Sequence, residues 1–192
     1  MDVARDNILQ RVRAAVAMEA HRPFPPTDAP IFPPIVDIED RFRAEFVSLR
    51  GEILEDDGAL SAFLSAFAKI ATDSGELTTK AVRAPNASVR ECELGVTGCD
   101  CLVAQTGSVI VSTLSAGGRA LSVLPPTHLV IARRAQIVPD LASAMALLRN
   151  RYDKHWPSAF SVITGPSRTA DIEKILIMGA HGPKRLALYF AE

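Results

Sequence analysis

The sequence has little net charge, few aromatic residues and no long hydrophobic run. Its 192 residues include 21 lysines and arginines against 22 acidic residues, so the formal net charge is −1. Proteins that bind nucleic acid usually gather basic residues on one face, and this balance predicts no nucleic-acid partner. No stretch reaches the ~18 consecutive apolar residues that span a bilayer, so we expect no membrane-spanning segment.

Cysteine is scarce as well, with only Cys92, Cys99 and Cys101 in one short segment. Three thiols could ligate zinc or an iron–sulfur cluster, but four ligands are usual and no Cys-x-x-Cys pair is present. Because cysteine is often buried, we expect core thiols, with Cys99 and Cys101 on one face of a strand. The first 20 residues carry charges every few positions and lack the apolar core of a signal peptide. Free thiols without a leader predict a cytoplasmic protein.

Three apolar, β-rich runs occupy the centre of the chain, at residues 102–104, 109–112 and 121–131, the last with a proline pair inside it. Both faces of these runs are largely apolar, which is typical of strands that helices cover on both sides. Polar residues and glycines gather at the turns between them. Such turns let the backbone approach a ligand, so we expect the functional site at the rim of this sheet.

The remaining pattern alternates helices with strands. We expect helices at 2–20, 38–49, 59–71 and 139–152, and strands at 52–54, 77–82, 160–163 and 186–190. This alternation predicts an α/β fold with a mainly parallel sheet.

Prolines between residues 22 and 35 separate the first helix from the rest, so we expect an N-terminal helix with a proline-rich arm over 1–35 and an α/β domain over 36–192. The arm either lays the first helix on its own domain or a partner chain, which would give a homo-oligomer, or serves as a flexible tether.

Three polar loops and one turn make up the candidate ligand site. The loop at 164–169 follows a predicted strand and contains a glycine–proline corner. A helical turn predicted near Ser167 or Thr169 would aim free N–H groups at an anion. Arg168 adds a guanidinium that suits a carboxylate or a phosphate. The candidate ligand-binding residues are Thr106, Gly107, Ser108, Gly117, Gly118, Arg119, Thr164, Gly165, Ser167, Arg168, Thr169 and His181.

Each loop also has a purely structural interpretation. The loop 106–108 can be a tight turn between strands, and Ser167 or Thr169 can simply cap a helical turn. His128 begins an apolar run, where a histidine is more often a core residue than a catalyst. No serine–histidine–acid set and no cluster with metal-ligand spacing can be assigned, so the catalytic residues stay unknown and no metal is expected.

The segments GVTGCDCLVAQTGSVIVS, GGRALSVLPPTHLVI and ITGPSRTADIEKILIMGAHGP resemble the lactate-utilisation protein C family, whose members carry a LUD domain, over roughly residues 38–192. This resemblance implies a three-layer α/β/α fold with a mainly parallel sheet, like that of ribose-phosphate isomerases, CoA transferases and formyltetrahydrofolate cyclo-ligases. It also implies work beside an iron–sulfur protein and a cysteine-rich partner that oxidise lactate to pyruvate.

Two functions remain open at this point. The first is an accessory subunit of such an iron–sulfur system with a retained site for a small anionic ligand. The chain has no flavin motif and no cluster-ligand motif, so the iron–sulfur clusters would belong to the partners and no cofactor is expected in this chain. The alternative is a small-molecule enzyme or binder of the isomerase or cyclo-ligase type, acting on a carboxylate or phosphate ligand. The resemblance supplies no catalytic residue.

Overall fold

The computed structural model describes residues 3–18, 34–73, 75–82, 87–114, 119–169, 177–179 and 181–192. The chain forms two compact units, Met1–Pro34 and Ile35–Glu192. The first unit contains helix α1 (Val3–Ala17), which confirms the predicted N-terminal helix, whereas most of the predicted proline-rich arm lies outside the described residues. Among the helices of the described residues, none has the length and apolar character to cross a bilayer.

The second unit is built on a parallel sheet of five strands in the order β1-β11-β6-β3-β2. The strands are β1 (Glu52–Leu54), β11 (Arg185–Phe190), β6 (Thr127–Ala132), β3 (Leu94–Thr97) and β2 (Ile70–Thr72). Every residue of β6 is buried, and β6 pairs with β11 along its whole length. A strand buried on both faces needs helices above and below, as the apolar runs predicted.

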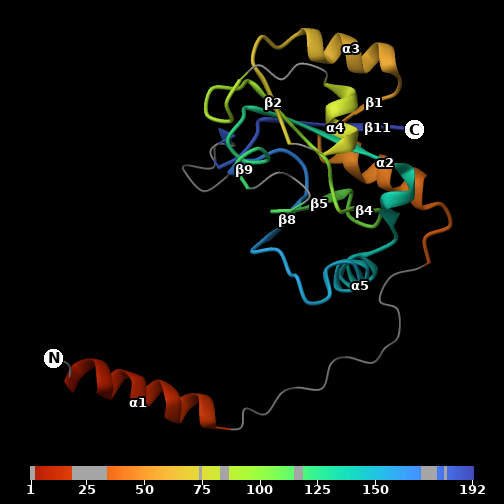
Figure 1. Ribbon diagram of the computed structural model, residues 1–192. Coiled ribbons are helices and arrows are strands. Elements are labelled where there is room, and N and C mark those ends of the chain that lie inside the picture. The colour runs from red at the N-terminus through yellow and green to blue at the C-terminus, as the bar shows by residue number, and fades with distance from the viewer. Residues whose placement is uncertain are drawn as a thin grey trace. The chain divides into compact units, whose positions relative to one another are not determined.

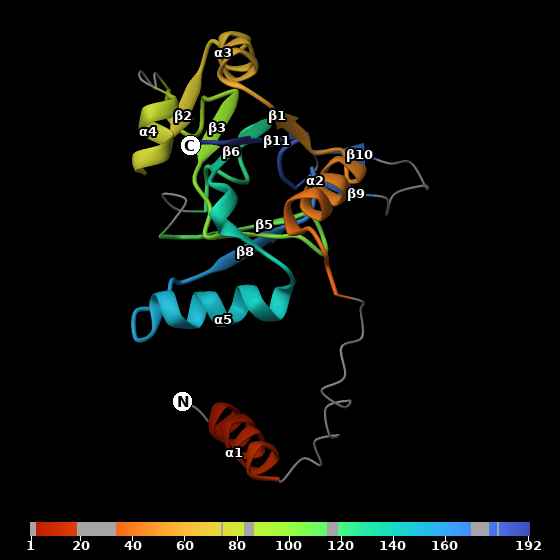
Figure 2. The same cartoon turned by 90° about the vertical axis from the view of Figure 1, so that its right-hand side faces the viewer.

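Helices cover both faces of this sheet. Helices α3 (Asp57–Ser65) and α4 (Glu76–Ala81) lie on one face, where Phe63 and Leu129 share a hydrophobic cluster. Helix α2 (Ile38–Ser48) covers the other face with Phe42 and Phe46, which are completely buried. The arrangement, visible in Figures 1 and 2, is the predicted three-layer α/β/α fold with a mainly parallel sheet.

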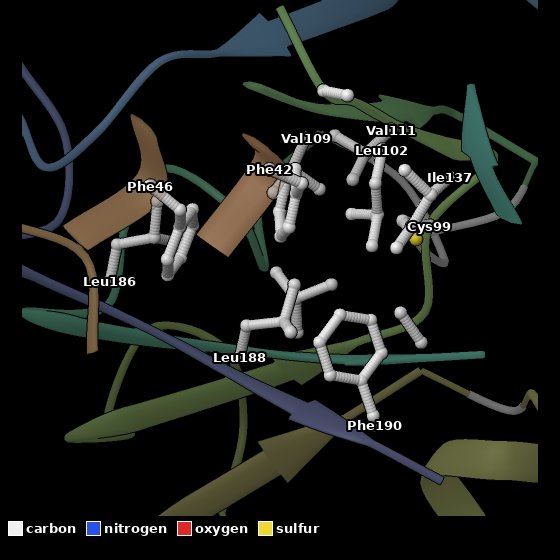
Figure 3. Close-up of a cluster of buried hydrophobic side chains, with 13 residues drawn as sticks. Phe42, Phe46, Cys99, Leu102, Val109, Val111, Ile137, Leu186, Leu188 and Phe190 are labelled. Atoms are coloured by element: carbon white, nitrogen blue, oxygen red, sulfur yellow. The ribbon is translucent and has the colours of Figure 1, made fainter. Parts of the chain in front are cut away.

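A second sheet of four strands, in the order β7-β4-β5-β8, packs beside α2. Its strands are β7 (Ile137–Val138), β4 (Cys101–Val103), β5 (Ser108–Ser112) and β8 (Phe160–Ile163). Figure 3 shows Leu102 and Val109 of this sheet beside Phe42 and close to Leu188 of β11. Helix α5 (Leu141–Tyr152) covers the opposite face, and η1 (Arg134–Gln136) joins β6 to β7.

Helix capping explains why two helices begin where the sequence predicted. The Asp37 side chain accepts hydrogen bonds from the backbone N–H groups of Glu39 and Asp40 at the start of α2. Asp140 accepts one from Ser143 N–H at 2.7 Å and begins α5. Such caps satisfy N–H groups that have no partner within the helix.

Two predicted elements differ from the structure. The helix expected at 59–71 ends at Ser65, because residues 70–72 leave it to pair with β3 in the parallel sheet. The strand expected at 77–82 is helix α4. The Asp73 carboxylate accepts hydrogen bonds from the Gly75 N–H and the Thr78 hydroxyl at its start, and these local contacts outweigh the strand preference of threonine and valine.

Three further expectations are corrected. Residues 121–124 form a turn rather than a strand, closed by a hydrogen bond from Leu124 N–H to the Ala120 carbonyl. The strand β3, which we did not predict, contains Gly95, where a Cβ would meet the Leu121 carbonyl and lie 2.7 Å from Pro125 Cγ. Cys99 and Cys101 are buried as expected, but they belong to clusters on opposite sides of the second sheet rather than to one face.

Candidate functional site

Three hydroxyl groups from two of the predicted loops form a continuous chain. Thr106 lies in the turn between β4 and β5, Ser108 begins β5, and Thr164 follows β8. Ser108 Oγ lies 2.7 Å from Thr106 Oγ1 and 2.8 Å from Thr164 Oγ1. Ser108 is buried, whereas both threonines are exposed. The structure therefore brings the loops at 106–108 and 164–169 together and presents two hydroxyls to solvent.

Glycines place both loops against the end of α2. Gly107 and Gly165 have φ angles of +59° and +81°, which favour glycine. A Cβ at Gly107 would lie 2.5 Å from Phe46 N, and a Cβ at Gly165 would lie 2.9 Å from the Leu49 carbonyl oxygen. The close approach of backbone to backbone requires glycine at both positions.

Arg168 lies in a short strand and not at the start of a helical turn, so that expectation is wrong. Strand β9 (Arg168–Thr169) pairs antiparallel with β10 (Ile177–Met178). Ser167 N–H donates to the Pro183 carbonyl at 2.9 Å, and the Ser167 carbonyl accepts from Gly179 N–H at 3.0 Å. The Ser167 N–H, which could have faced an anion, is therefore occupied, while the Arg168 side chain is exposed.

The remaining predicted site residues are less closely gathered. His181 is exposed, and its loop reaches Ser167, since a Cβ at Gly182 would lie 3.3 Å from Ser167 Cβ. Arg119 is exposed at the start of the turn that covers Gly95, and within the described residues no hydrogen bond joins it to the hydroxyl chain. Gly117 and Gly118 lie outside the described residues.

These loops lie at the amino ends of the parallel strands. The Pro126 carbonyl, directly before β6, accepts a hydrogen bond from Lys184 N–H directly before β11, and the adjacent Pro183 bonds Ser167. We call the group of Thr106, Ser108, Thr164, Gly165, Ser167 and Arg168 the amino-edge cluster. Its exposed guanidinium and two exposed hydroxyls are donors suited to a small anion.

Sequence reasoning missed a cavity of about 990 Å³ at the opposite, carboxyl edge of the sheet. Its walls come from the ends of β1 and β11 and from α3 and α4, and they include Asp56, Asp57, Leu60, Lys80, Arg134 and Tyr189. Ligands of open α/β sheets generally bind outside the carboxyl ends of the strands. The acidic run 55–57 directly after the strand at 52–54 was the available signal.

Charged groups at this edge are largely paired with one another. Arg43 and Arg134 both donate to Glu39 Oε1, at 3.0 and 3.1 Å, and both lie over the Phe190 ring, 5.1 and 5.3 Å from its centroid. The Tyr189 hydroxyl donates to Asp57, which raises the pKa of Tyr189 to about 12. The phenol therefore stays neutral near pH 7 and acts as a donor.

Several buried polar groups hold the interior together. His128 Nε2 lies 2.8 Å from Thr97 Oγ1, His128 Nδ1 has no hydrogen-bond partner among the described residues, and burial lowers the pKa of His128 to about 4. Asp100 is fully buried and accepts hydrogen bonds from Arg151 at 3.1 Å and Tyr152 at 2.5 Å. His128 is thus the core residue that its position favoured, whereas the bonds of Asp100 to Arg151 and Tyr152 were not predicted, because 51 residues or more separate the partners.

The cysteines contribute buried thiols and not a cluster of ligands on the surface. Cys92, Cys99 and Cys101 are free and buried, and burial raises the pKa of Cys101 to about 11. Within the ranges that the structure describes, no group of three or more histidine, cysteine or acidic side chains is placed to hold a metal ion.

A parallel sheet between helices, with polar loops at one edge and a cavity at the other, defines a three-layer α/β/α protein. Residues 35–190 match the LUD domain, and the chain belongs to the LUD domain family. This confirms the resemblance seen in the sequence.

Curated relatives are similar to half of the chain. "Lactate utilization protein C" of Anoxybacillus flavithermus is 36% identical over 96 residues, which cover 50% of this chain and 42% of the relative. The protein of the same name from Bacillus subtilis is 34% identical over 99 residues, covering 50% and 41%. Each match thus spans less than half of the relative's length.

A solved structure supports the fold. The crystal structure of a DUF162 family protein from Deinococcus radiodurans superimposes with a TM-score of 0.61 at 20% sequence identity, covering 81% of this chain and 96% of that one. At this identity the likeness concerns the fold alone.

Proposed function

We propose that the chain is an accessory subunit of a lactate-utilisation system in which partner proteins oxidise lactate to pyruvate. The observation that carries this proposal is membership of the LUD domain family together with relatives named lactate utilization protein C. The iron–sulfur clusters of the oxidation would belong to iron–sulfur and cysteine-rich partners. The placement of the thiols supports that assignment, because a cluster needs several converging thiolates and Cys99 and Cys101 lie on opposite sides of the second sheet.

The amino-edge cluster would hold a small carboxylate in this role. Lactate and pyruvate both carry a carboxylate, whose oxygens accept hydrogen bonds from guanidinium and hydroxyl donors. Arg168 supplies the charge, and Thr106 and Thr164 supply exposed hydroxyls whose positions the buried Ser108 fixes. The site would bind and orient the anion, while the electrons pass to the partners.

Deletion of the gene tests the proposed role of the protein in lactate utilisation. We expect a deletion of its gene in the native host to abolish growth on lactate while growth on pyruvate continues, because pyruvate is the product of the step. Growth rate on each carbon source is the measurement. Undiminished growth of the deletion strain on lactate would reject the assignment.

Arg168→Ala tests the anion site. We expect lactate, pyruvate or phosphate at about a hundred times its dissociation constant to stabilise the wild type by about 2.7 kcal/mol, which raises Tm by about 5–11 °C. The variant should lose this shift and keep its ligand-free Tm, because Arg168 is exposed.

The matched control is Arg149→Ala, which removes an exposed arginine from the surface of α5. It should respond to the anion as the wild type does. A shift that persists in Arg168→Ala, or is lost equally in Arg149→Ala, would show that the anion binds elsewhere.

The carboxyl-edge cavity favours a second candidate function, that of a small-molecule enzyme or binder acting on a carboxylate or phosphate. Lys80 and Arg134 are its basic lining residues, and Leu60 adds an apolar wall. The same measurement of Tm with lactate, pyruvate or phosphate discriminates the two functions. A ligand shift that is lost in Lys80→Ala and Arg134→Ala but kept in Arg168→Ala would assign the ligand to this cavity.

A further inference from the structure

Strand β8 is the last strand of the second sheet, and β5 is its one partner among the described residues. Figure 2 shows it running beside β5, next to α5. It is only half buried, and Val162 at its centre is 51% exposed. The strand expected to be buried at 160–163 is therefore an open sheet edge within the part of the chain that the structure describes.

The backbone of this edge has hydrogen-bonding groups that face away from β5. Thr113 N–H donates to the Ala159 carbonyl at 3.1 Å, in the register that pairs Ser112 with Phe160. Hydrogen-bonded and non-hydrogen-bonded pairs alternate along an antiparallel ladder, so Ser161 and Ile163 direct their N–H and C=O groups toward β5. The N–H and C=O groups of Phe160 and Val162 consequently point to the free edge.

The edge strand β8 carries no charged side chain that would prevent its pairing with β8 of a second copy. Natural edge strands usually carry a proline, a lysine or another charged residue that prevents pairing with a further strand. Residues 155–167 contain no lysine, arginine, aspartate or glutamate, and β8 itself contains no proline. A charged edge strand would be repelled by the identical charges of a second copy. Because this strand is neutral, no electrostatic repulsion opposes its pairing with itself.

We propose that β8 pairs antiparallel with β8 of a second copy of this chain and forms a symmetric dimer with one continuous sheet. The register that satisfies the free groups is centred on Ser161, which lies on the two-fold axis. Phe160 then lies opposite Val162 of the second copy, and each such pair exchanges both backbone hydrogen bonds.

The side chains suit this register. Phe160 and Val162 lie on the same face of the strand, and the half-exposed Trp156 packs edge-on against Phe160 with ring centroids 5.6 Å apart. Aromatic and β-branched residues opposite each other stabilise antiparallel pairs. The interface is isologous, so two copies close the edge and no further chain can add.

Val162→Lys tests the pairing by sedimentation of the full chain. The wild type should sediment as a dimer, and the variant should dissociate with a dissociation constant weaker by at least about tenfold, because each lysine replaces a valine opposite Phe160 of the second copy and lies diagonally across from the other lysine. Val47→Lys, at another exposed valine on α2, should leave the dimer intact, as should Val16→Glu on α1. Circular dichroism melts verify that each variant folds.

Ser161→Cys tests the register independently of stability. Non-hydrogen-bonded antiparallel pairs hold their Cα atoms about 4.5 Å apart, within the range of a disulfide. Oxidation of the variant should give a covalent dimer on a non-reducing gel, while Ser158→Cys should not, and the native thiols are buried. A monomeric wild type, a dimer that survives Val162→Lys, or equal cross-linking of both cysteine variants would each overturn the proposal.

Discussion

Replacement of Gly107 by alanine is expected to destabilise the fold by several kcal/mol. The residue has φ +59°, and a Cβ would lie 2.5 Å from Phe46 N and 2.7 Å from the Glu45 carbonyl carbon. Both contacts are to backbone atoms of α2. This backbone cannot move aside without displacing the completely buried side chains of Phe42 and Phe46, which α2 carries. Positive φ alone costs alanine about 1 kcal/mol, and overpacking adds about 1–3 kcal/mol.

The measurement is urea unfolding of Gly107→Ala beside Gly58→Ala. Gly58 lies in α3, where a Cβ would meet only the Asp56 side chain, at 3.1 Å, and where alanine is the better helix former. Gly58→Ala should therefore be neutral or slightly stabilising. Because Gly107 separates Thr106 from Ser108, its replacement should also weaken any anion response of the amino-edge cluster. An unfolding midpoint for Gly107→Ala equal to that of the wild type would contradict this packing.

Acid sensitivity from His128 is the second large effect that we expect. Burial lowers the pKa of this histidine from 6.5 to about 4, so the unfolded chain binds its proton more readily than the folded chain. The stability that the neutral imidazole contributes is fully present above about pH 6.5 and is lost as the pH falls toward 4. The shift corresponds to about 3 kcal/mol across this window.

Urea unfolding of His128→Gln at several pH values between 7.5 and 4.5 isolates this contribution. Over this range the variant should lose less stability than the wild type by about 2.5 kcal/mol, since carboxylates contribute equally in both proteins. His155→Gln removes an exposed histidine and should follow the wild type. Parallel pH profiles for the wild type and His128→Gln would show that the imidazole is not held neutral in the core.

The sequence-based predictions are most accurate where one local pattern decides the structure. The helices at 38–49 and 139–152 combine an apolar stripe with an aspartate cap, and the structure confirms both. The predicted strand at 77–82 is wrong, because hydrogen bonds from Gly75 and Thr78 to the Asp73 carboxylate stabilise a helix there. Strand propensity is a weak guide when local side-chain hydrogen bonds favour a helical turn.

The candidate site was predictable only in part, because strand order decides which loops meet. The glycines and hydroxyls of 106–108 and 164–165 do come together, since β5 and β8 are neighbours in the second sheet. Arg119 belongs to a turn that packs on Gly95 instead. The carboxyl-edge cavity draws Leu60, Lys80 and Tyr189 from three distant segments, which no spacing in the sequence connects.

Complementation of the deletion strain is the most direct test of the account. The strain would be supplied with the wild type, Arg168→Ala or Arg149→Ala at matched protein levels, and growth on lactate would be measured against growth on pyruvate. We expect the wild type and Arg149→Ala to restore growth on lactate and Arg168→Ala not to do so, while all strains grow on pyruvate. Equal growth on lactate with Arg168→Ala would contradict a functional anion site in the amino-edge cluster, and growth without any copy would contradict the role in lactate utilisation.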